Sequence, residues 1–464
     1  MTKFVFKTSN VGSLKNKYDL IIIGSGATGL AAALQAKQLG LSPIILEKRT
    51  RLGGNSSRAS SGMNAAETLV ELNHHIVDSY EDFYNDTFIG GGKKNNPELL
   101  KYFVSHAALA INWLANLNIP LTSLTISGGQ KTKRTHRPAS LKAIGDFLIY
   151  HFLKVVDQAN IPIFNKVKVK KLKMEDDSIK GIEVILPNQK KKIISTKAII
   201  LATGGFGASK QLVVKYRPDL KGYGTTNQPG ATGDGIKLAQ NIGASLVDMD
   251  QIQIHPTVQQ DTDHTYLIGE AGRGEGAILV NKSGQRFVNE LDTRKNVSHA
   301  ITSLPEKSAY LILDQNIRNH FKAMEFYDQV GLVISAPSLS ALAKKIQIDS
   351  HNFSSTIKTW NQYVANQKDL DFGRTTGIDR DISQAPFYAI HVSPAVHYTM
   401  GGVKINHKAQ VLNTNNKPIS GLFAGGEVTG GLHGNNRLGG NSISETVIFG
   451  RQAAQQVFKY LKSK

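Results

Sequence analysis

A buried strand that runs directly into a glycine-rich turn and a helix constrains this chain more than any other feature. Residues 19–23 are Asp-Leu-Ile-Ile-Ile, residues 24–29 are Gly-Ser-Gly-Ala-Thr-Gly, and residues 30–39 form an Ala-rich stretch of helical character. A second apolar strand, residues 42–46, leads into Glu47, eighteen residues after the last glycine of the turn. A strand that is apolar on both faces and is followed by a helix begins a doubly wound α/β fold.

The same turn has the context that a dinucleotide-binding fingerprint requires. Gly24 permits the tight turn, Gly26 lets the backbone approach a pyrophosphate, and Gly29 lets the helix pack on the strand. The N-terminus of the helix then faces the phosphates. Glu47 would accept hydrogen bonds from the ribose hydroxyls and would repel a 2′-phosphate. A glycine turn that binds no ligand is the alternative interpretation.

Composition narrows the class of protein. The chain has 464 residues, of which 40% are hydrophobic and 20% charged, as in a globular protein with more than one core. No run approaches the ~20 apolar residues that cross a bilayer. The absence of cysteine excludes disulfides, thiolate metal sites, cysteine-ligated iron–sulfur clusters and thioether-attached haem. Redox chemistry would therefore use an organic cofactor, or metals held by histidine and carboxylates, and we find no pattern that predicts a metal site.

The formal net charge is +19, from 55 Lys and Arg against 36 Asp and Glu. Such a charge attracts nucleic acid, anionic lipid or small anionic substrates. Lysines alternate with apolar residues over 166–173, and no aromatic residue lies between them, which favours a solvated sheet face over a nucleic-acid site. We expect neither a nucleic-acid nor a membrane partner. Residues 1–17 lack the apolar segment of a secretory signal, which predicts a short disordered N-terminal tail and a cytoplasmic protein.

Four further glycine-rich segments accompany the fingerprint: residues 51–57 (RLGGNSS), 60–64 (SSGMN), 202–205 (ATGG) and 424–427 (AGGE). This set resembles the FAD-binding domain of the fumarate reductase/succinate dehydrogenase flavoprotein family, from about Tyr18 to the C-terminus. The resemblance implies an α/β protein, with a Rossmann-like FAD-binding domain in two sequence segments and an inserted α+β capping domain. We expect a tail at 1–17, FAD-binding segments at 18–252 and 372–464, and the capping domain at 253–371.

The resemblance also implies which residues hold FAD. It places Glu47 at the adenosine ribose, Glu427 at the ribityl chain, and Gly62 with Met63 beside the flavin. Membrane-bound members carry a covalent FAD bond on a histidine whose position corresponds to Asn55, so we expect noncovalent FAD. The full implied set is Gly24, Gly26, Gly29, Glu47, Gly53, Gly54, Asn55, Ser56, Gly62, Met63, Thr203, Gly204, Glu427 and Ser442.

Later segments are similar to those of soluble fumarate reductases in this family: residues 253–257 (QIHPT), 269–274 (GEAGRG), 286–294 (RFVNELDTR), 397–402 (HYTMGG) and 433–441 (HGNNRLGGN). That similarity implies reduction of fumarate to succinate, with hydride from flavin N5 at one alkene carbon and a proton at its neighbour. It places Arg437 and His397 on one substrate carboxylate and His255 on the other. Arginine suits this task because its planar fork binds a carboxylate through two hydrogen bonds.

The resemblance makes Arg294 the proton donor, with Glu270 and Arg273 as its proton relay. A guanidinium can protonate a nascent carbanion because the carbanion is far more basic, and it stabilises the charge before transfer. Without the resemblance, the three residues would be a structural ion-pair cluster. One position departs from the pattern: Gly269 stands where fumarate-specific relatives often have threonine. Another unsaturated acid, of the urocanate, acrylate or cinnamate type, therefore stays open as the substrate.

The source of electrons is not encoded in a recognisable motif. Since cysteine is absent and the FAD and capping parts leave no sequence for an FMN domain, we expect a separate donor: reduced free flavin, a flavin reductase or an electron-transfer protein. The oligomeric state stays open, and a monomer is compatible with the sequence. Two other function classes also stay open. One is a nucleic-acid-binding protein with a vestigial nucleotide fold, and the other is a flavin oxidase or steroid dehydrogenase, which would need a base such as tyrosine in place of Arg294.

Overall fold

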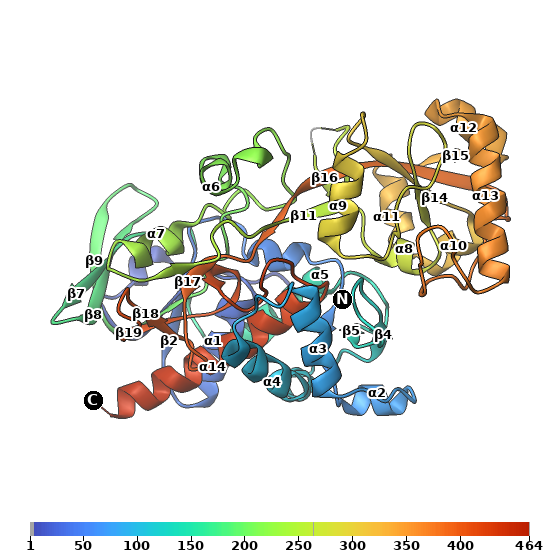
Figure 1. Ribbon diagram of the computed structural model, residues 1–464. Coiled ribbons are helices and arrows are strands. Elements are labelled where there is room, and N and C mark those ends of the chain that lie inside the picture. Colours follow the sequence, from blue (N-terminus) through green and yellow to red (C-terminus); the bar gives the residue numbers. More distant parts are fainter. Residues whose placement is uncertain (1–3, 263, 464) are drawn as a thin grey trace.

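The computed structural model describes residues 4–262 and 264–463, and its elements form two units with separate hydrophobic cores (Figure 1). The larger unit is built on an eight-stranded sheet in which the strands follow the order β18-β19-β8-β9-β1-β2-β6, and β7 pairs with β8. Their bounds are β1 Lys17–Ile23, β2 Pro43–Leu46, β6 Ile163–Phe164, β7 Lys168–Glu175, β8 Ser178–Ile185, β9 Lys191–Leu201, β18 Gln410–Leu412 and β19 Pro418–Ala424.

The centre of this sheet is parallel. β1 pairs in parallel with β2 and β9, and β19 pairs in parallel with β9, so two distant sequence segments build one sheet. The last four residues of β1 are at most 6% exposed, as expected of an apolar strand covered on both faces. Helix α1 (Ala27–Gln38) packs on α14 (Asn441–Lys462), and Gly450 allows the close approach because a Cβ there would lie 2.7 Å from the carbonyl oxygen of Thr28.

The second unit contains a six-stranded antiparallel sheet in the order β12-β11-β16-β14-β13, with β15 paired to β16. Its core draws on residues from Ile268 to Val392. The elements are β11 Ile252–Gln259, β12 Tyr266–Leu267, α8 Ala271–Gly274, β13 Ile278–Val280, α9 Arg294–Thr302, β14 Ala309–Leu313, α10 Gln315–His320, α11 Met324–Gln329, β15 Ile334–Ala336, α12 Leu339–Ile346, α13 Ser350–Ala365 and β16 Phe387–Thr399.

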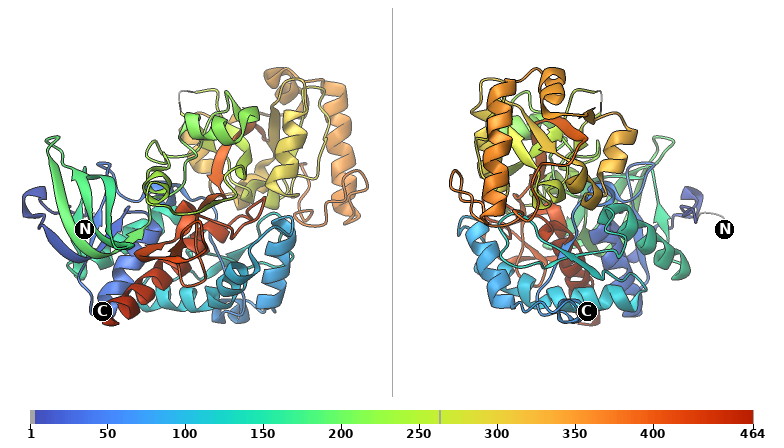
Figure 2. Two further views of the ribbon diagram at one scale, coloured as in Figure 1. Left: turned by 60° about the vertical axis from the view of Figure 1, so that its left-hand side comes forward. Right: turned by 90° about the vertical axis from the view of Figure 1, so that its right-hand side faces the viewer.

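Strands β11 and β16 connect the two units. β11 leads from the larger unit into the second one and β16 leads back, and the two strands pair with each other in antiparallel register (Figure 1). Figure 2 shows the second unit on one side of the larger unit in both views. The predicted fold class is confirmed: a Rossmann-like domain in two sequence segments carries an inserted α+β unit. The boundaries at residues 253 and 371 stay a prediction.

The remaining elements of the larger unit surround the sheet or connect its strands. They are η1 Val11–Ser13, η2 Gly54–Arg58, β3 Met63–Asn64, α2 Leu69–Asn73, α3 Tyr80–Gly90, α4 Pro97–Asn116, β4 Ser123–Thr125, β5 Thr135–Arg137, α5 Ile144–Gln158, α6 Lys210–Tyr216, η3 Pro218–Leu220, α7 Asp234–Gln240, β10 Leu246–Val247, β17 Gly402–Lys404, η4 Gly426–Val428 and β20 Thr429–Gly430.

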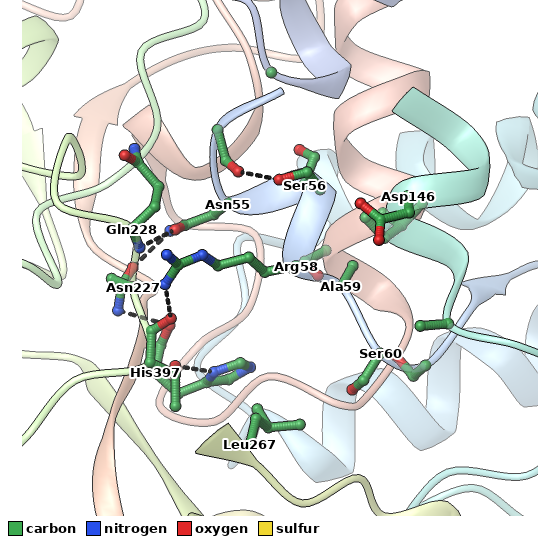
Figure 3. A pocket seen from close by; sticks show the side chains of 18 of the residues that line it. Asn55, Ser56, Arg58, Ala59, Ser60, Asp146, Asn227, Gln228, Leu267 and His397 are labelled. Carbon is green, nitrogen blue, oxygen red and sulfur yellow. Dashed lines mark hydrogen bonds between the residues drawn. The ribbon is translucent and has the colours of Figure 1, made fainter. Parts of the chain in front are cut away.

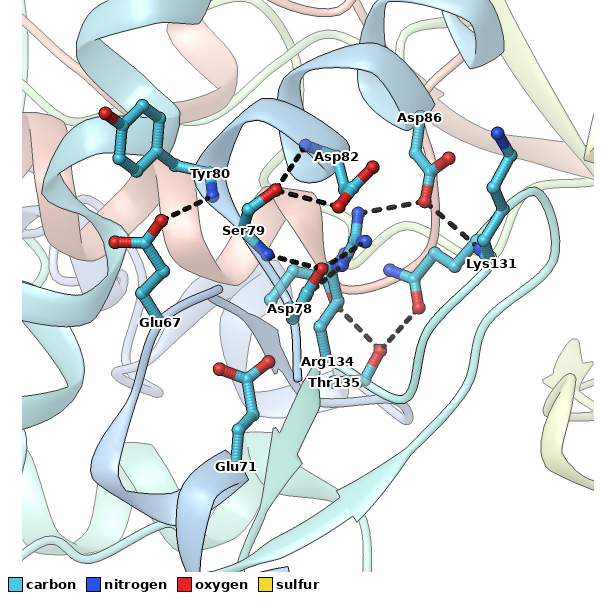
Figure 4. Close-up of polar contacts among 12 residues, drawn as sticks. Glu67, Glu71, Asp78, Ser79, Tyr80, Asp82, Asp86, Lys131, Arg134 and Thr135 are labelled. Carbon is cyan, nitrogen blue, oxygen red and sulfur yellow. Dashed lines mark hydrogen bonds and ion pairs between the residues drawn. The ribbon is translucent and has the colours of Figure 1, made fainter. Parts of the chain in front are cut away.

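A buried ion-pair cluster anchors the segment that joins β4 to β5 (Figure 4). Arg134 donates through Nε and Nη2 to the two carboxylate oxygens of Asp78 at 2.8 and 2.9 Å, and its Nη1 lies 2.9 Å from Asp86. The ring of Phe83 covers the guanidinium at 5.2 Å. The backbone amide of Lys131 also donates to Asp86, at 3.1 Å. These contacts fix the segment that carries Ser127, a residue of the cavity described below.

The expectation of a disordered N-terminal tail is wrong for residues 4–17. Leu14 is 2% exposed within the core, and the amide of Ser9 donates to the carbonyl of Ile163 at 2.8 Å. The apolar residues near Phe4 were too few to predict a packed segment, yet Phe4 makes an edge contact with Tyr150. Residues 1–3 lie outside the described part of the chain.

None of the helices in the described residues combines the length and apolar character that crossing a bilayer requires.

Candidate active site

A cavity of about 970 Å³ opens where the two units meet, at the carboxyl ends of β1, β2 and β9. The larger unit forms part of the cavity wall with the glycine turn and η2, and the second unit contributes Tyr327 and Leu267, the latter labelled in Figure 3. Ligands of open α/β sheets bind at this edge of the sheet. The predicted residues that line it are Gly24, Gly26, Glu47, Gly54, Asn55, Ser56, Thr203, Gly204, Glu270, Arg294, His397, Glu427, Arg437 and Ser442.

The glycine turn fits a pyrophosphate. A Cβ on Gly24 would overlap the carbonyl oxygen of Ala202, and one on Gly29 would overlap that of Gly24, so these two glycines serve the packing of strand and helix. A Cβ on Gly26 would make only ordinary van der Waals contacts, with the hydroxyl of Ser56 at 3.6 Å and the carbonyl oxygen of Gly53 at 3.9 Å. The free space beside Gly26 belongs to the cavity, at the N-terminus of α1, where anions are favoured.

Glu47 is half-buried at the end of β2. Its Oε2 accepts hydrogen bonds from the amide and the hydroxyl of Ser25, at 3.2 and 2.7 Å, and its Oε1 accepts from the amide of Arg49 at 2.8 Å. The carboxylate is therefore held rigidly at the rim of the turn. Thr203 lies across the cavity with a buried hydroxyl that has no partner in the described chain, a group that a ligand can satisfy.

Asn55 links three segments around the cavity. Its amide nitrogen donates to Asn227 at 2.6 Å and to Glu427 at 3.4 Å, and its oxygen accepts from the amide of Gln228 at 2.8 Å (Figure 3). Glu427 accepts a further bond from the amide of Thr399 at 3.1 Å. Burial raises the pKa of Glu427 to about 7 against the lowering effect of these bonds. No cation lies within ion-pair distance of it in the described residues.

Four of the predicted cofactor residues lie behind the cavity wall: Gly29, Gly53, Gly62 and Met63. Met63 is fully buried and pairs with His136 of β5. A Cβ on Gly62 would overlap the carbonyl of His136, so the need for glycine there comes from packing between β3 and β5. In this structure Gly62 and Met63 do not line the cavity, where their predicted contacts with the flavin would be made.

Arg437 reaches the cavity from the loop before α14, with 3% of the residue exposed. Its Nη2 donates to Gln253 Oε1 at 3.0 Å, its Nη1 donates to the carbonyl of Leu438 at 3.1 Å, and its Nε has no partner in the described chain. Burial, followed by the charge of Arg294, lowers the pKa of Arg437 to about 10. The guanidinium stays charged at neutral pH, with no carboxylate within 4.0 Å in the described residues.

His255 and His397 lie beside each other, with ring centroids 5.2 Å apart. His255 is on β11, and the amide of Thr257 donates to its Nδ1 at 3.3 Å. His397 is on β16, where its Nδ1 pairs with the hydroxyl of Thr226 at 2.7 Å. Burial, reinforced by the positive charge of Arg294, holds the pKa of both rings well below the ordinary value. Both histidines are therefore neutral at neutral pH.

Arg294, Glu270 and Arg273 form a buried chain of ionic contacts. Arg294, the first residue of α9, donates from Nε to Glu270 Oε1 and from Nη1 to Gln253 Oε1, the latter at 3.1 Å. Nη2 of Arg273 lies 3.9 Å from the same oxygen of Glu270. Burial alone would raise the pKa of Glu270, but the charges of Arg294 and then Arg273 outweigh it and lower that pKa to about 2.

Comparison with known proteins identifies the family to which this chain belongs. A family model described as an FAD binding domain matches residues 19–443. "Fumarate reductase (cytochrome)" of Shewanella frigidimarina is 40% identical over 96% of this chain and 77% of that protein. The open conformation of a flavocytochrome c3 fumarate reductase superposes with a TM-score of 0.81 at 38% identity, covering 97% of this chain and 79% of the other. The chain belongs to the FAD-binding fumarate reductase flavoprotein family.

A further relative, "NADH:fumarate oxidoreductase" of Klebsiella pneumoniae, is 48% identical over 95% of this chain. The present chain spans about half of that protein, 48% of its length. Family membership makes FAD the cofactor, and the glycine turn, Glu47 and Thr203 provide groups that fit it.

Gln253 is a residue to which the sequence assigned no role. Its Oε1 accepts from both Arg294 and Arg437, and its Nε2 donates to Asn436 at 3.1 Å and to the carbonyl of Arg437 at 2.7 Å. One amide therefore sets the separation of two like-charged guanidinium groups. The period of two in β11 places Gln253 on the same face as His255, which was the signal available in the sequence.

Gly269 lies beside Glu270 and leaves open space. A Cβ there would meet only the hydroxyl of Tyr327, at 3.8 Å. That hydroxyl accepts from the amide of Gly269 at 3.0 Å and donates to the carbonyl of Leu267 at 3.1 Å. The cavity next to the proposed catalytic groups thus has room for a substituent at this point.

Proposed function

We propose that this protein reduces fumarate to succinate with bound FAD. The observation that carries the proposal is a convergence of hydrogen-bond donors that lack partners in the described chain: Nε of Arg437 and Nε2 of His255. They lie among the positive charges of Arg437, Arg294 and Arg273, whereas Glu270 is the one carboxylate that contacts this group of arginines in the described residues. A dianionic acid supplies the missing acceptors and charge.

His255 presents a proton donor to such a substrate. A backbone amide can only donate, so the bond from Thr257 makes Nδ1 of His255 the acceptor and places the ring proton on Nε2. That Nε2–H has no hydrogen-bond acceptor in the described chain. We assign it to one substrate carboxylate, and we assign Arg437 and His397 to the other, where the planar fork of Arg437 can bind two oxygens.

When bound, FAD would supply the hydride for one alkene carbon. Arg294 then gives a proton to the neighbouring carbon, and Glu270 and Arg273 restore that proton. The surroundings of Glu270 favour this order, because the charge of Arg294 is the largest influence that lowers its pKa. Once Arg294 has lost its proton, that influence disappears and the pKa of Glu270 rises. Glu270 then becomes able to take a proton from the side of Arg273 and return it to Arg294.

Arg294→Gln tests this proposal. The variant keeps a polar side chain beside Glu270 but has no transferable guanidinium proton, so turnover with fumarate and reduced methyl viologen should fall at least 1,000-fold, an order-of-magnitude expectation for loss of a general acid that also stabilises charge. FAD content and fumarate binding, measured by absorbance and calorimetry, should persist. Lys295→Gln, the next residue on α9, is the matched control. A wild-type rate in Arg294→Gln would reject the assignment.

A second substrate class is favoured by the open space at Gly269. The open space beside Gly269 and Tyr327 would accommodate an unsaturated acid whose far substituent is larger than a carboxylate. Urocanate and cinnamate, which carry a ring at the far carbon, and acrylate, which carries only hydrogen there, are the informative comparisons with fumarate in the same viologen assay. A kcat/KM for one of them above that for fumarate would make that acid the substrate and keep the same roles for Arg294 and Arg437.

We propose that FAD is held noncovalently and receives its electrons from a separate donor. Asn55, at the position where relatives with covalent FAD have histidine, is an unreactive amide engaged by Asn227, Gln228 and Glu427. Acid precipitation of the holoenzyme should therefore leave the yellow colour in the supernatant. Colour that stays in the washed pellet would contradict noncovalent binding without affecting the proposed reaction.

A further inference from the structure

Arg437 is held in place by neutral groups. Besides Gln253 and the carbonyl of Leu438, the ring of Tyr398 lies against its guanidinium, 4.4 Å from centroid to Cζ. No carboxylate lies within ion-pair distance in the part of the chain that the structure describes. An arginine that binds an anionic ligand has to be positioned by uncharged groups, so that its charge is not already neutralised. The face of an aromatic ring is such a group.

Tyr398 is itself fixed by a buried carboxylate. Its hydroxyl donates to Glu445 Oε2 at 2.6 Å, and Nε2 of His433 lies 2.9 Å from the same oxygen. Tyr398, Glu445 and His433 are 6%, 2% and 2% exposed. They come from three segments, because Tyr398 lies near the end of β16, His433 lies in the loop after β20, and Glu445 is in the first turns of α14. The contact therefore joins three separate parts of the site.

The hydrogen bond from Tyr398 to Glu445 also strengthens the contact between the Tyr398 ring and Arg437. Burial, followed by the charge of Glu445, raises the pKa of Tyr398 well above its ordinary value, so the phenol stays a neutral donor. A phenol that donates to a carboxylate becomes polarised, which makes the ring more negative toward a cation on its face. The cation here is Arg437.

We propose that Tyr398 is a positioning residue for Arg437, and that Glu445 and His433 hold Tyr398 in the orientation this requires. The face of the Tyr398 ring contacts the guanidinium of Arg437, and in this proposal Tyr398 acts on the substrate through Arg437. The inference rests on the proposed function only through the role of Arg437 in binding a substrate carboxylate. It adds a buried Tyr–Glu–His set to the residues that determine substrate affinity.

Three variants of the FAD-loaded protein test the proposal. Tyr398→Leu removes the ring and should raise the KM for fumarate at least ten-fold, the size expected for a desolvated cation–π contact. The kcat should change less than three-fold, because the carboxylate is gripped equally before and during reaction. Tyr398→Phe keeps the ring but loses the bond to Glu445, and Glu445→Gln keeps the shape but loses the charge. Both should raise the KM about three-fold.

Tyr388 offers a matched control on the same strand. It is 6% exposed, its hydroxyl donates to Gln315 at 2.5 Å, and the guanidinium of Arg318 lies 4.7 Å from its ring. This pair lies in the second unit and does not line the cavity. Tyr388→Leu should therefore leave the KM for fumarate unchanged, although it removes the same kind of contact.

The outcomes separate the two proposals. A KM in Tyr398→Leu within two-fold of wild type, or an equal rise in Tyr388→Leu, overturns the positioning role and leaves the proposed function standing. Wild-type holoenzyme that neither binds nor reduces fumarate overturns both. Where Tyr398→Leu fails to accumulate as folded holoenzyme, Tyr398→Phe and Glu445→Gln decide: unchanged KM values in both overturn the positioning role.

Discussion

Two buried arginines of this protein have opposite electrostatic surroundings. Arg134, 0% exposed, is enclosed by the carboxylates of Asp78 and Asp86 (Figure 4). Arg437, 3% exposed, has a tyrosine ring, an amide oxygen and a backbone carbonyl as neighbours, and no carboxylate within ion-pair distance in the described residues. The fold neutralises the first charge and leaves the second without a counter-ion.

This difference distinguishes an arginine with a structural role from one that binds a ligand. A buried charge without a partner disfavours folding by several kcal/mol, and the lowered pKa of Arg437, about 10, expresses the same penalty. A fold retains such a group where a ligand supplies the missing charge. Arg134 instead holds the segment between β4 and β5 in place, which makes it an architectural residue of the cavity wall.

Arg134→Met should give the largest loss of stability. It leaves the carboxylates of Asp78 and Asp86 buried without their cation, and removing one partner of a buried ion pair costs about 3–5 kcal/mol. Guanidinium denaturation of the FAD-loaded protein measures this change in the free energy of unfolding. A loss below about 1 kcal/mol would contradict the structural assignment of this cluster.

Arg437→Met is the counterpart in the same comparison. Because it removes a buried charge that has no carboxylate partner, the free energy of unfolding should stay within about 1 kcal/mol of wild type or rise. The KM for fumarate should rise at least 100-fold, as expected for loss of a desolvated charged hydrogen-bonding partner worth about 3 kcal/mol. A variant that lost stability as much as Arg134→Met would remove the distinction between the two sites.

Two buried carboxyl groups differ in the same way as the two arginines, because one has oppositely charged neighbours and the other has none. Glu270 contacts Arg294 and Arg273, which lower its pKa to about 2, whereas Glu427 has no such cation and burial raises its pKa to about 7. The first group is stabilised as the anion and the second as the neutral acid. The two should therefore give opposite dependences of stability on pH, in different pH ranges.

Glu270→Gln tests the first of these. A folded-state pKa below the unfolded value of 4.5 gives stability that is present above pH 4.5 and is lost as the pH falls toward 2. The shift corresponds to about 3 kcal/mol at pH 6 and about half of that at pH 3. The difference in unfolding free energy between wild type and Glu270→Gln should therefore shrink between pH 6 and pH 3. A constant difference over that range would contradict the lowered pKa.

Much of the fold was predictable because its signals are local. The apolar run of β1, the glycine turn and the Ala-rich α1 are contiguous, and their spacing alone predicts a strand, a phosphate-binding turn and a helix. The family resemblance supplied what those residues could not, namely the inserted unit and the return of the chain to the first sheet. The packing of residues 4–17 was missed because the apolar residues that pack there, Phe6, Val11 and Leu14, are separated by polar ones without a periodic pattern.

The charged residues of the site could be predicted because they lie in familiar motifs. The residues that hold those charged side chains in place could not. Gln253 lies in one of those motifs, but its bridge between Arg294 and Arg437 depends on the distance between β11 and two separate loops. Likewise, Tyr398 and Glu445 are 47 positions apart, and nothing in either segment signals the hydrogen bond between them. Such pairings follow from tertiary packing, which a single sequence does not encode in any local pattern.

Glu427→Gln should give the smallest of these effects and the one most specific to the cofactor site. A folded-state pKa above the unfolded value gives stability that is complete below pH 4.5 and is lost as the pH rises through about 7. The FAD-free wild-type protein should therefore lose about 2 kcal/mol from this group between pH 5 and pH 7, whereas Glu427→Gln, which stays neutral, should not. Denaturation curves at pH 5, 6 and 7 compare the two proteins. Parallel pH dependences would mean that Glu427 ionises without penalty, and the contrast with Glu270 would then fail, because both carboxylates would have compensated charges.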